Sequence, residues 1–333
     1  MKLFKFWWLI VTVAFVLVTA VIGLAPLGVQ AQYQVFLPII IKSPYEPAKG
    51  GIVINGLGNA SSCNDLTLLG EGWYFNNTPW PSTGPGCFTG DRRFVPRLYN
   101  DVQVNDPAIL DQAINNAKAS GWLLGFVEPN LSWQSNVTPA NGALAWKKIE
   151  DAIAAKGLVL GVDIKLVAPA PNQWAPGYCP GCTGGASNVY GHQWVWYMMT
   201  EYKARYGKNP HFDAMAWNYY YNFQSSVSTE FVNYFTARRN ESLTRGLTGD
   251  VWIMEYAGAC WNTGTKYPTY ANEVMDKVTP WLKSTSWIKR YAWFGNRLHN
   301  YYAVHQNEVP LYDCSLLDAN GNLKSLGVKY LAY

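Results

Sequence analysis

Eight short apolar runs of strand length recur between residues 51 and 295. They cover residues 51–55, 72–76, 94–99, 122–128, 158–168, 213–220, 251–256 and 290–295. Helical patterns lie between the later runs and after the last one, at 106–120, 140–156, 192–206, 228–239, 269–284 and 324–332. This alternation predicts an α/β fold, a single-domain (β/α)₈ TIM barrel over residues 50–333. An open doubly wound sheet is the alternative, but no Gly-x-Gly-x-x-Gly motif follows the first run.

The N-terminal 49 residues have a different character from the rest of the chain. A short basic stretch precedes an apolar run at 6–24, and Val29-Gln30-Ala31 fits a small-x-small cleavage site. This layout predicts a signal peptide over 1–31, or an uncleaved anchor, because the apolar run is nearly long enough to cross a bilayer. Residues 32–49 contain three prolines and are expected to form a linker. We therefore expect a secreted or cell-surface protein. It would contact a membrane only if the N-terminal segment stays uncleaved.

Composition excludes several classes of protein. Charged residues make up 14% of the chain and aromatic residues 15%, a balance that is not typical of a disordered chain. The formal net charge is +4 and no run of five like charges occurs, so we expect no nucleic-acid partner. The four histidines, at 192, 211, 299 and 305, show no metal-ligand spacing, and we expect neither a metal nor a cofactor.

Six cysteines in an exported chain favour three disulfides. Sequence proximity suggests that Cys63 pairs with Cys87 and that Cys179 pairs with Cys182, which leaves Cys260 and Cys314 for the third bridge. The Cys-Pro-Gly-Cys segment at 179–182 also resembles a redox motif or half of a zinc site. A loop staple is the favoured interpretation, because no second Cys-x-x-Cys occurs.

Two of the expected strands end in a glutamate, Glu128 on the fourth and Glu255 on the seventh. In a barrel, only the carboxyl ends of strands and the loops after them reach the active face. Asp213 and Asp250 start strands, and glutamates on helices, such as Glu150 and Glu230, are expected to be solvated. An ion pair is the alternative role for a strand-end glutamate. We favour catalysis, because both runs are otherwise apolar and paired carboxylates among aromatic residues are typical of glycosidic-bond cleavage.

Six segments resemble, in the same order, motifs of glycoside hydrolase family 128, the glycosyl hydrolase catalytic core of secreted endo-β-1,3-glucanases. The family motifs are WYYNW, FVPMLW, GFNEPD followed by a tryptophan, LVSPA, VWITEF and RYAWFG. The matching segments here are WYFN (73–76), FVPRLY (94–99), GFVEPN (125–130) followed by Trp146, LVAPA (166–170), VWIMEY (251–256) and RYAWFG (290–295). The resemblance covers about residues 50–333.

The resemblance implies a retaining barrel enzyme that cleaves β-1,3-glucan internally, with Glu128 as general acid/base and Glu255 as nucleophile. It also implies carboxyl groups about 5–5.5 Å apart. Two positions depart from the family pattern. Val127 stands where the family has the asparagine that usually hydrogen-bonds the sugar 2-hydroxyl. The family's HWY on the sixth strand reads Asn218-Tyr219-Tyr220 here, so asparagine replaces histidine while Tyr220 is kept.

Sugars present apolar C–H faces, so clefts that bind glycans are lined by aromatic rings and a few polar groups. Trp133, Trp174 and Trp261 follow strands in loops, where burial is less expected, and are the favoured subsite residues. The full set of candidate substrate-binding residues is Trp73, Asn76, Trp133, Trp174, Asn218, Tyr220, Trp261 and Trp293. For Trp293, which lies within a strand, core packing is an equal alternative.

The expected partner is thus a β-glucan polysaccharide or oligosaccharide, bound by a monomer. Val127 and Asn218 motivate two alternatives to an endo-β-1,3-glucanase. One is a non-catalytic domain that binds wall glycans on the same fold. The other is a hydrolase of another β-glycan.

Overall fold

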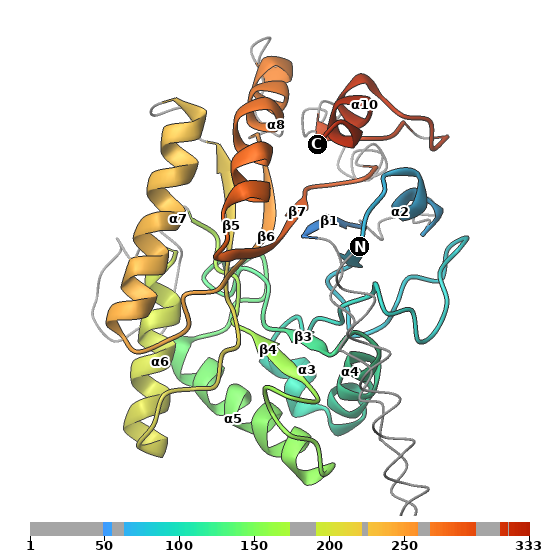
Figure 1. Ribbon diagram of the computed structural model, residues 1–333. Coiled ribbons are helices and arrows are strands. Elements are labelled where there is room, and N and C mark those ends of the chain that lie inside the picture. The colour runs from blue at the N-terminus through green and yellow to red at the C-terminus, as the bar shows by residue number, and fades with distance from the viewer. Residues whose placement is uncertain are drawn as a thin grey trace, which may run out of the picture. The chain divides into compact units, whose positions relative to one another are not determined.

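The computed structural model describes residues 49–54, 63–173, 191–221, 226–258, 267–297, 314–318 and 320–333. Parallel strands lie at the centre of the fold, with helices outside them (Figure 1). One sheet has the order β2-β1-β7-β6-β5 and a second pairs β3 with β4. Their bounds are β1 Gly50–Val53, β2 Trp73–Phe75, β3 Trp122–Leu124, β4 Lys165–Val167, β5 Met215–Tyr221, β6 Val251–Gly258 and β7 Ile288–Trp293.

Single parallel bridges join the two sheets into a ring. Val167 of β4 bridges Ala214, just before β5. On the other side, the segment 94–97 bridges β2 through Phe94 and β3 through Arg97. Counting this segment, eight strand positions close the ring, which confirms the barrel expected from the sequence.

The third expected strand, at 94–99, is not a regular strand, because Pro96 has no N–H to donate to a ladder. It still holds its place in the ring, since the Pro96 carbonyl accepts from the Leu124 amide at 2.9 Å. The fifth expected strand, at 158–168, is also too long. Residues 159–163 form a turn in which the Asp163 carboxylate accepts from the Val159 amide at 2.7 Å, and β4 begins only at Lys165.

Helices lie around the ring of strands (Figure 1). They are α2 Asn64–Leu68, α3 Asp101–Asn105, α4 Pro107–Ser120, α5 Pro139–Ala155, α6 Gln193–Tyr206, α7 Val227–Thr244, α8 Tyr267–Ser284 and α10 Ser325–Leu331. Local signals set their ends. Asp106 caps the first turn of α4 by accepting from the amides of Ala108 and Ile109, and Gly121 ends that helix with a φ of 75°.

Side-chain alternation along the strands produces two apolar cores. One lies inside the barrel and includes Val53, Trp73, Trp122, Trp252 and Met254. The second, larger core packs the outer faces of the strands against the helices. The buried Arg290 lies in the barrel interior over the rings of Trp252 at 4.2 Å, Trp122 at 5.3 Å and Trp73 at 5.4 Å.

Two helical glutamates that were expected to be solvated are buried. Glu150 of α5 faces α6, where it accepts a hydrogen bond from the Tyr202 hydroxyl at 2.5 Å. Its other oxygen accepts from the His211 amide at 2.9 Å. Glu230 of α7 meets the Tyr219 hydroxyl at 3.4 Å. Polar partners on neighbouring elements satisfy these carboxylates. A helical pattern in the sequence does not reveal such partners.

Cys63 and Cys87 form a disulfide, the pairing expected from sequence proximity, with Cα atoms 4.9 Å apart. Cys314 is also disulfide-bonded, and its partner lies outside the described residues. Cys179, Cys182 and Cys260 lie outside them as well, as do residues 1–48 with the expected signal peptide and most of the linker. The described residues belong to one compact unit, 43–333, and none of their helices is long and apolar enough to cross a membrane.

Candidate active site

Glu128 lies in a turn beyond β3 rather than at the end of a strand. β3 ends at Leu124, and the chain then continues to a single bridge between Val127 and Ala170. The Glu128 amide donates to the Ala170 carbonyl at 2.9 Å, and its φ is 40°, in the left-handed region. A non-glycine residue held in that region is strained, and such strain often accompanies a functional site. The turn brings the buried Glu128 side chain to the carboxyl end of the barrel.

Glu255 reaches the same place because β6 contains a bulge. Ile253 pairs with Trp217 of β5 and Glu255 pairs with Asn218, so Met254 has no partner in this register. Regular alternation would place Glu255 on the outer face with Ile253. The extra residue reverses the alternation, so Tyr256 joins the outer core and Glu255 turns toward Glu128.

Asn218 connects the two carboxylates. Its amide nitrogen donates to Glu128 Oε1 at 2.9 Å and to Glu255 Oε2 at 3.1 Å. These two oxygens therefore lie within about 6 Å of each other. The Tyr220 hydroxyl also donates to Glu255 Oε2, at 2.6 Å. The structure thus brings together four residues selected from the sequence.

The sequence analysis missed four further residues at or beside this site: Arg97, Asn77, Asn172 and Asn130. The Asn172 side chain donates to Glu128 Oε1 at 2.8 Å. The Asn172 backbone amide donates to Asn130 Oδ1 at 2.9 Å. Arg97 lies with Nη1 3.9 Å from Glu255 Oε1 and donates to Asn77 Oδ1 at 2.9 Å. An arginine inside an apolar strand-length run was a usable signal for Arg97. Asparagines are common in loops, so the sequence offered no comparable signal for Asn77 or Asn172.

Burial and the two negative charges determine how the pair is protonated. Burial raises the pKa of Glu128 to about 7, and the charge of Glu255 also acts to raise it. Hydrogen bonds from Asn218 and Asn172 and the charge of Arg97 act to lower it. Burial also raises the pKa of Glu255, but Arg97 opposes this shift first and Tyr220 second. The charge of Arg97 and the Tyr220 hydroxyl thus favour the ionised form of Glu255, while the charge of Glu255 favours the protonated form of Glu128.

Tyr220 stays a neutral donor in this environment. Burial raises the pKa of its hydroxyl well above the ordinary value, and the charges of Glu255 and Glu128 raise it further. A neutral hydroxyl 2.6 Å from Glu255 Oε2 stabilises the ionised carboxylate.

Trp73 and Trp293 were expected to bind substrate, but the structure places both in the core. Trp73 starts β2, at the end of the barrel away from the carboxylates, and its indole donates to the Lys49 carbonyl at 3.2 Å. Trp293 faces outward, packs on Tyr256 at 5.1 Å and donates to the Cys314 carbonyl at 2.7 Å. Trp73 packs within the inner core and Trp293 within the outer core, so neither offers a ring face to a ligand.

Asn76 forms its side-chain hydrogen bonds within its own loop rather than with the carboxylates. Its amide nitrogen donates to the Trp80 carbonyl at 2.9 Å and to Ser82 Oγ at 3.1 Å, and the neighbouring Asn77 is the one that reaches the site. Trp133 is 71% exposed in the loop after Glu128, as a subsite residue should be. Trp174 and Trp261 lie outside the described residues.

Val127 is buried, and its carbonyl accepts from the Ser135 hydroxyl. Its side chain offers no donor or acceptor next to Glu128. The amides that contact Glu128 come instead from Asn172 and Asn218, on other segments of the ring.

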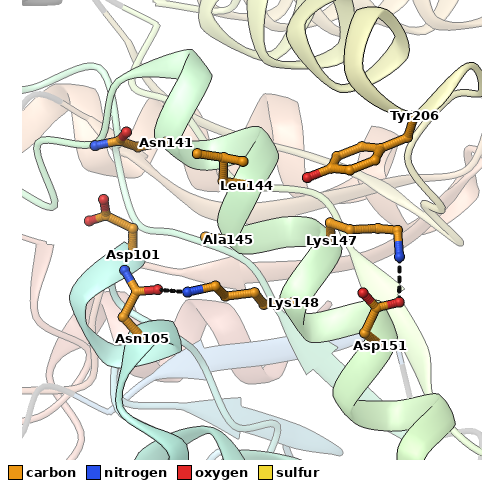
Figure 2. Close-up of a pocket in the computed structure, with 9 residues that line it drawn as sticks. All are labelled: Asp101, Asn105, Asn141, Leu144, Ala145, Lys147, Lys148, Asp151 and Tyr206. Atoms are coloured by element: carbon orange, nitrogen blue, oxygen red, sulfur yellow. Dashed lines mark hydrogen bonds and ion pairs between the residues drawn. The ribbon is translucent and has the colours of Figure 1, made fainter.

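A separate surface hollow of about 530 Å³ lies between α3, α5 and α6. Figure 2 shows its lining, where Lys148 contacts Asn105 and Lys147 pairs with Asp151 at 2.5 Å. Neither carboxylate of the candidate pair, nor any of their partners, lines it. We therefore place the candidate active site at the barrel end that carries Glu128 and Glu255. Among the described residues, no cluster of histidine, cysteine or acidic side chains could hold a metal ion.

Comparison with known families identifies the catalytic domain. The model of the glycosyl hydrolase catalytic core matches residues 51–330. The chain belongs to this family. No curated protein matches the sequence.

Solved structures of glycoside hydrolase family 128 share the fold of this glycosyl hydrolase catalytic core. An endo-β-1,3-glucanase of subgroup II from Pseudomonas viridiflava is 24% identical, covers 86% of this chain and 97% of its own, and has a TM-score of 0.59. A subgroup I endo-β-1,3-glucanase from Amycolatopsis mediterranei, in complex with laminaripentaose, is 22% identical over 86% and 99%, with a TM-score of 0.60. A curdlan-specific exo-β-1,3-glucanase of subgroup III from Blastomyces gilchristii, in complex with glucose, is 22% identical over 86% and 98%, with a TM-score of 0.59. At these identities the likeness establishes the shared barrel.

Proposed function

We propose that the protein is an exported retaining glycoside hydrolase that cleaves β-1,3-glucan internally, with Glu255 as nucleophile and Glu128 as acid/base. The observation that carries the proposal is the single Asn218 nitrogen bound to both carboxylates, which limits their nearest oxygens to about 6 Å. Retaining enzymes hold the two carboxyl groups about 5–5.5 Å apart, whereas inverting enzymes need about 6.5–9.5 Å to admit a water molecule. The arrangement here favours double displacement.

In the first step, ionised Glu255 attacks the anomeric carbon while Glu128 gives its proton to the leaving glycosidic oxygen. The C–O bond breaks as the glycosyl–enzyme ester forms, and Glu128 is left ionised. In the second step, Glu128 takes a proton from water, and the resulting hydroxide attacks the anomeric carbon and releases Glu255. The preference of the proton for Glu128 prepares the free enzyme for the first step.

The substrate class comes from the family and its relatives. The Amycolatopsis mediterranei and Blastomyces gilchristii structures are described as β-1,3-glucanases, one endo-acting and one exo-acting. We favour internal cleavage and assign Trp133, Trp174 and Trp261 to sugar subsites, with Asn218 and Tyr220 at the point of cleavage. The exposure of Trp133 supports its part in this assignment. An N-terminal signal at 1–31 would deliver the enzyme outside the cell.

Val127 supports one competing function, a glycan-binding domain without turnover. The buried valine cannot contact the sugar 2-hydroxyl, a contact that strengthens in the transition state of retaining enzymes. Against this alternative, Glu128 and Glu255 keep hydrogen-bonded, electrostatically distinct environments that a binding protein does not need. A hydrolase of another β-glycan would use the same two carboxylates.

The test is release of reducing sugar from soluble β-1,3-glucan by the purified protein and by Glu255→Gln. We expect turnover by the parent and a loss of about 10³-fold or more in the variant, because the nucleophile is gone. Glu230→Gln is the matched control, since Glu230 is a buried glutamate on α7 outside the site. A ladder of oligosaccharides indicates internal cleavage, and glucose alone indicates an exo mode. Binding without turnover by the parent would contradict the proposal and favour the glycan-binding domain.

A further inference from the structure

Arg97 is the buried cation of the site. Its side chain is completely buried, and its guanidinium donates Nε to the Gly125 carbonyl at 2.9 Å and Nη2 to the Phe126 carbonyl at 3.1 Å. Nη1 donates to Asn77 Oδ1 at 2.9 Å and lies 3.9 Å from Glu255 Oε1. All three hydrogen-bond acceptors are neutral. Each of the three guanidinium nitrogens therefore donates to a neutral acceptor, and the charge must be balanced by other groups.

The hydrogen bonds of Arg97 act on the backbone that carries Glu128. Gly125 and Phe126 lie between the end of β3 and the left-handed Glu128. A planar guanidinium with fixed donor directions can hold two successive carbonyls at once, which a lysine cannot reproduce. Arg97 thereby links the third strand position of the ring to the turn that presents Glu128.

The charge of Arg97 acts on the pair as a whole. A buried guanidinium is costly unless an opposite charge lies near it. The acidic groups that interact with it are Glu255 and Glu128, together with the neutral hydroxyls of Tyr99 and Tyr220. One ionised glutamate makes this cluster neutral. Two ionised glutamates leave one excess negative charge, and two protonated glutamates leave the cation unbalanced.

We infer that Arg97 is a positioning residue that selects the singly protonated state of the Glu128–Glu255 pair and holds the turn that carries Glu128. This inference rests on the proposed function, for which that protonation state is the working one. The family motif FVPMLW that 94–99 resembles has methionine where this chain has Arg97. A methionine there would fill similar space without charge or donors.

The charge of Arg97 affects the pKa values of both glutamates in the same direction. Arg97 holds the pKa values of both Glu128 and Glu255 below what burial alone would give. Removing its charge raises both. The acidic limb of kcat/KM reports ionisation of Glu255 and the basic limb reports the proton on Glu128, so both limbs should move to higher pH. A role in packing alone would lower activity without moving either limb.

The experiment compares pH profiles of kcat/KM on soluble β-1,3-glucan for the parent, Arg97→Met and Arg97→Lys. We expect Arg97→Met to move the acidic limb up by about one pH unit or more, the scale of a close opposite charge. Arg97→Lys should keep the limbs near their original positions while kcat falls about 10-fold or more, because misplacement of a catalytic group is costly. Arg290→Met is the control for losing a buried arginine, since Arg290 lies among tryptophans in the barrel interior, and its limbs should not move. An equal shift in Arg97→Lys and Arg97→Met, or an unmoved profile in Arg97→Met, would overturn the inference.

A second measurement separates this inference from the proposed function. Protein with ¹³C-labelled glutamate carboxyl groups is titrated by NMR, with Glu128→Gln and Glu255→Gln used to assign the two signals. Upward movement of both titrations in Arg97→Met supports the electrostatic role even if the parent shows no turnover, in which case only the proposed function fails. Unmoved titrations overturn the inference whatever the activity. If Arg97→Met does not fold, Arg97→Gln, which keeps hydrogen-bond donors without charge, takes its place in both measurements with the same outcomes.

Discussion

Asn218 shares its amide nitrogen between the two carboxylates. The side chain is fully buried, and no described residue donates to Asn218 Oδ1. A buried acceptor without a donor is costly, and such atoms in native proteins often await a ligand or a water molecule. A sugar hydroxyl is a suitable donor. This geometry supports the proposed contact between Asn218 and the substrate.

Asn218→Ala and Asn172→Ala should therefore differ in effect. Both remove a hydrogen bond that lowers the pKa of Glu128, so both should move the basic limb of the pH–rate profile to higher pH. Asn218 also donates to Glu255, and no described residue donates to its Oδ1, so its removal should cost about 10²-fold in kcat/KM. Asn172→Ala should cost less than about 10-fold. Equal losses in steady-state assays of the two variants would contradict a special role for Asn218.

At the residue scale, the sequence predicted the site residues that follow expected strands. It did not predict those whose positions depend on how distant segments pack in the barrel. Glu128 and Glu255 stood out because an apolar run ended in a carboxylate. Asn77 and Arg97 reach the site only because segments distant in sequence lie side by side in the barrel. The tryptophans of the strands could not be assigned to core or cleft from sequence, because the face that each one occupies depends on bulges and on position along the strand.

Gly125 shows how closely neighbouring elements approach at the carboxyl end of β3. A Cβ atom at Gly125 would lie 2.7 Å from the backbone nitrogen of Pro169 and 2.9 Å from the Trp146 ring. Pro169 belongs to the segment that follows β4, so its backbone cannot withdraw without disturbing the ring. Close packing of these two segments fixes the backbone at Gly125, from which the chain continues to Glu128.

We expect Gly125→Ala to lower the free energy of unfolding by about 1–3 kcal/mol, as overpacking of a dense core does. For a domain of this size, the thermal midpoint should fall by about 2–4 °C for each kcal/mol. Gly157→Ala is the matched control, because Gly157 has a φ of 71° but no atom within 4 Å of an added Cβ. That variant should show only the cost of a left-handed backbone, with unchanged kcat. Unchanged stability in calorimetry, or unchanged kcat, in Gly125→Ala would contradict this description of the turn.

At the element scale, helices were predicted better than strands. Caps such as Asp106 and Gly121 are local signals, so the bounds of α4 agree with the sequence to within a residue. Strands depend on partners. Pro96 removes a donor from the third strand, and the turn at 159–163 shortens the fifth, although both runs are apolar enough to read as strands. The bulge at Met254, which aims Glu255, has no sequence signal at all.

At the scale of the whole barrel, the alternating pattern was sufficient to predict the fold. Eight strand positions close into a ring with an inner and an outer core, and the family model spans nearly the same residues, 51–330. The pattern succeeds because each strand and helix must bury one face, which leaves few arrangements for a chain of this length. The bridges that complete the ring are single contacts, too short to be seen as separate signals in sequence.

We propose that Glu128 and Glu255 act together by double displacement. The most direct test is the anomeric configuration of the product at the moment of release, followed by ¹H NMR during the first minutes of hydrolysis of a β-1,3-linked oligosaccharide. Retention predicts that the new reducing end appears as the β-anomer and converts to α only by slow mutarotation. Initial release of the α-anomer would mean a single displacement by water, and would contradict the roles assigned to both glutamates.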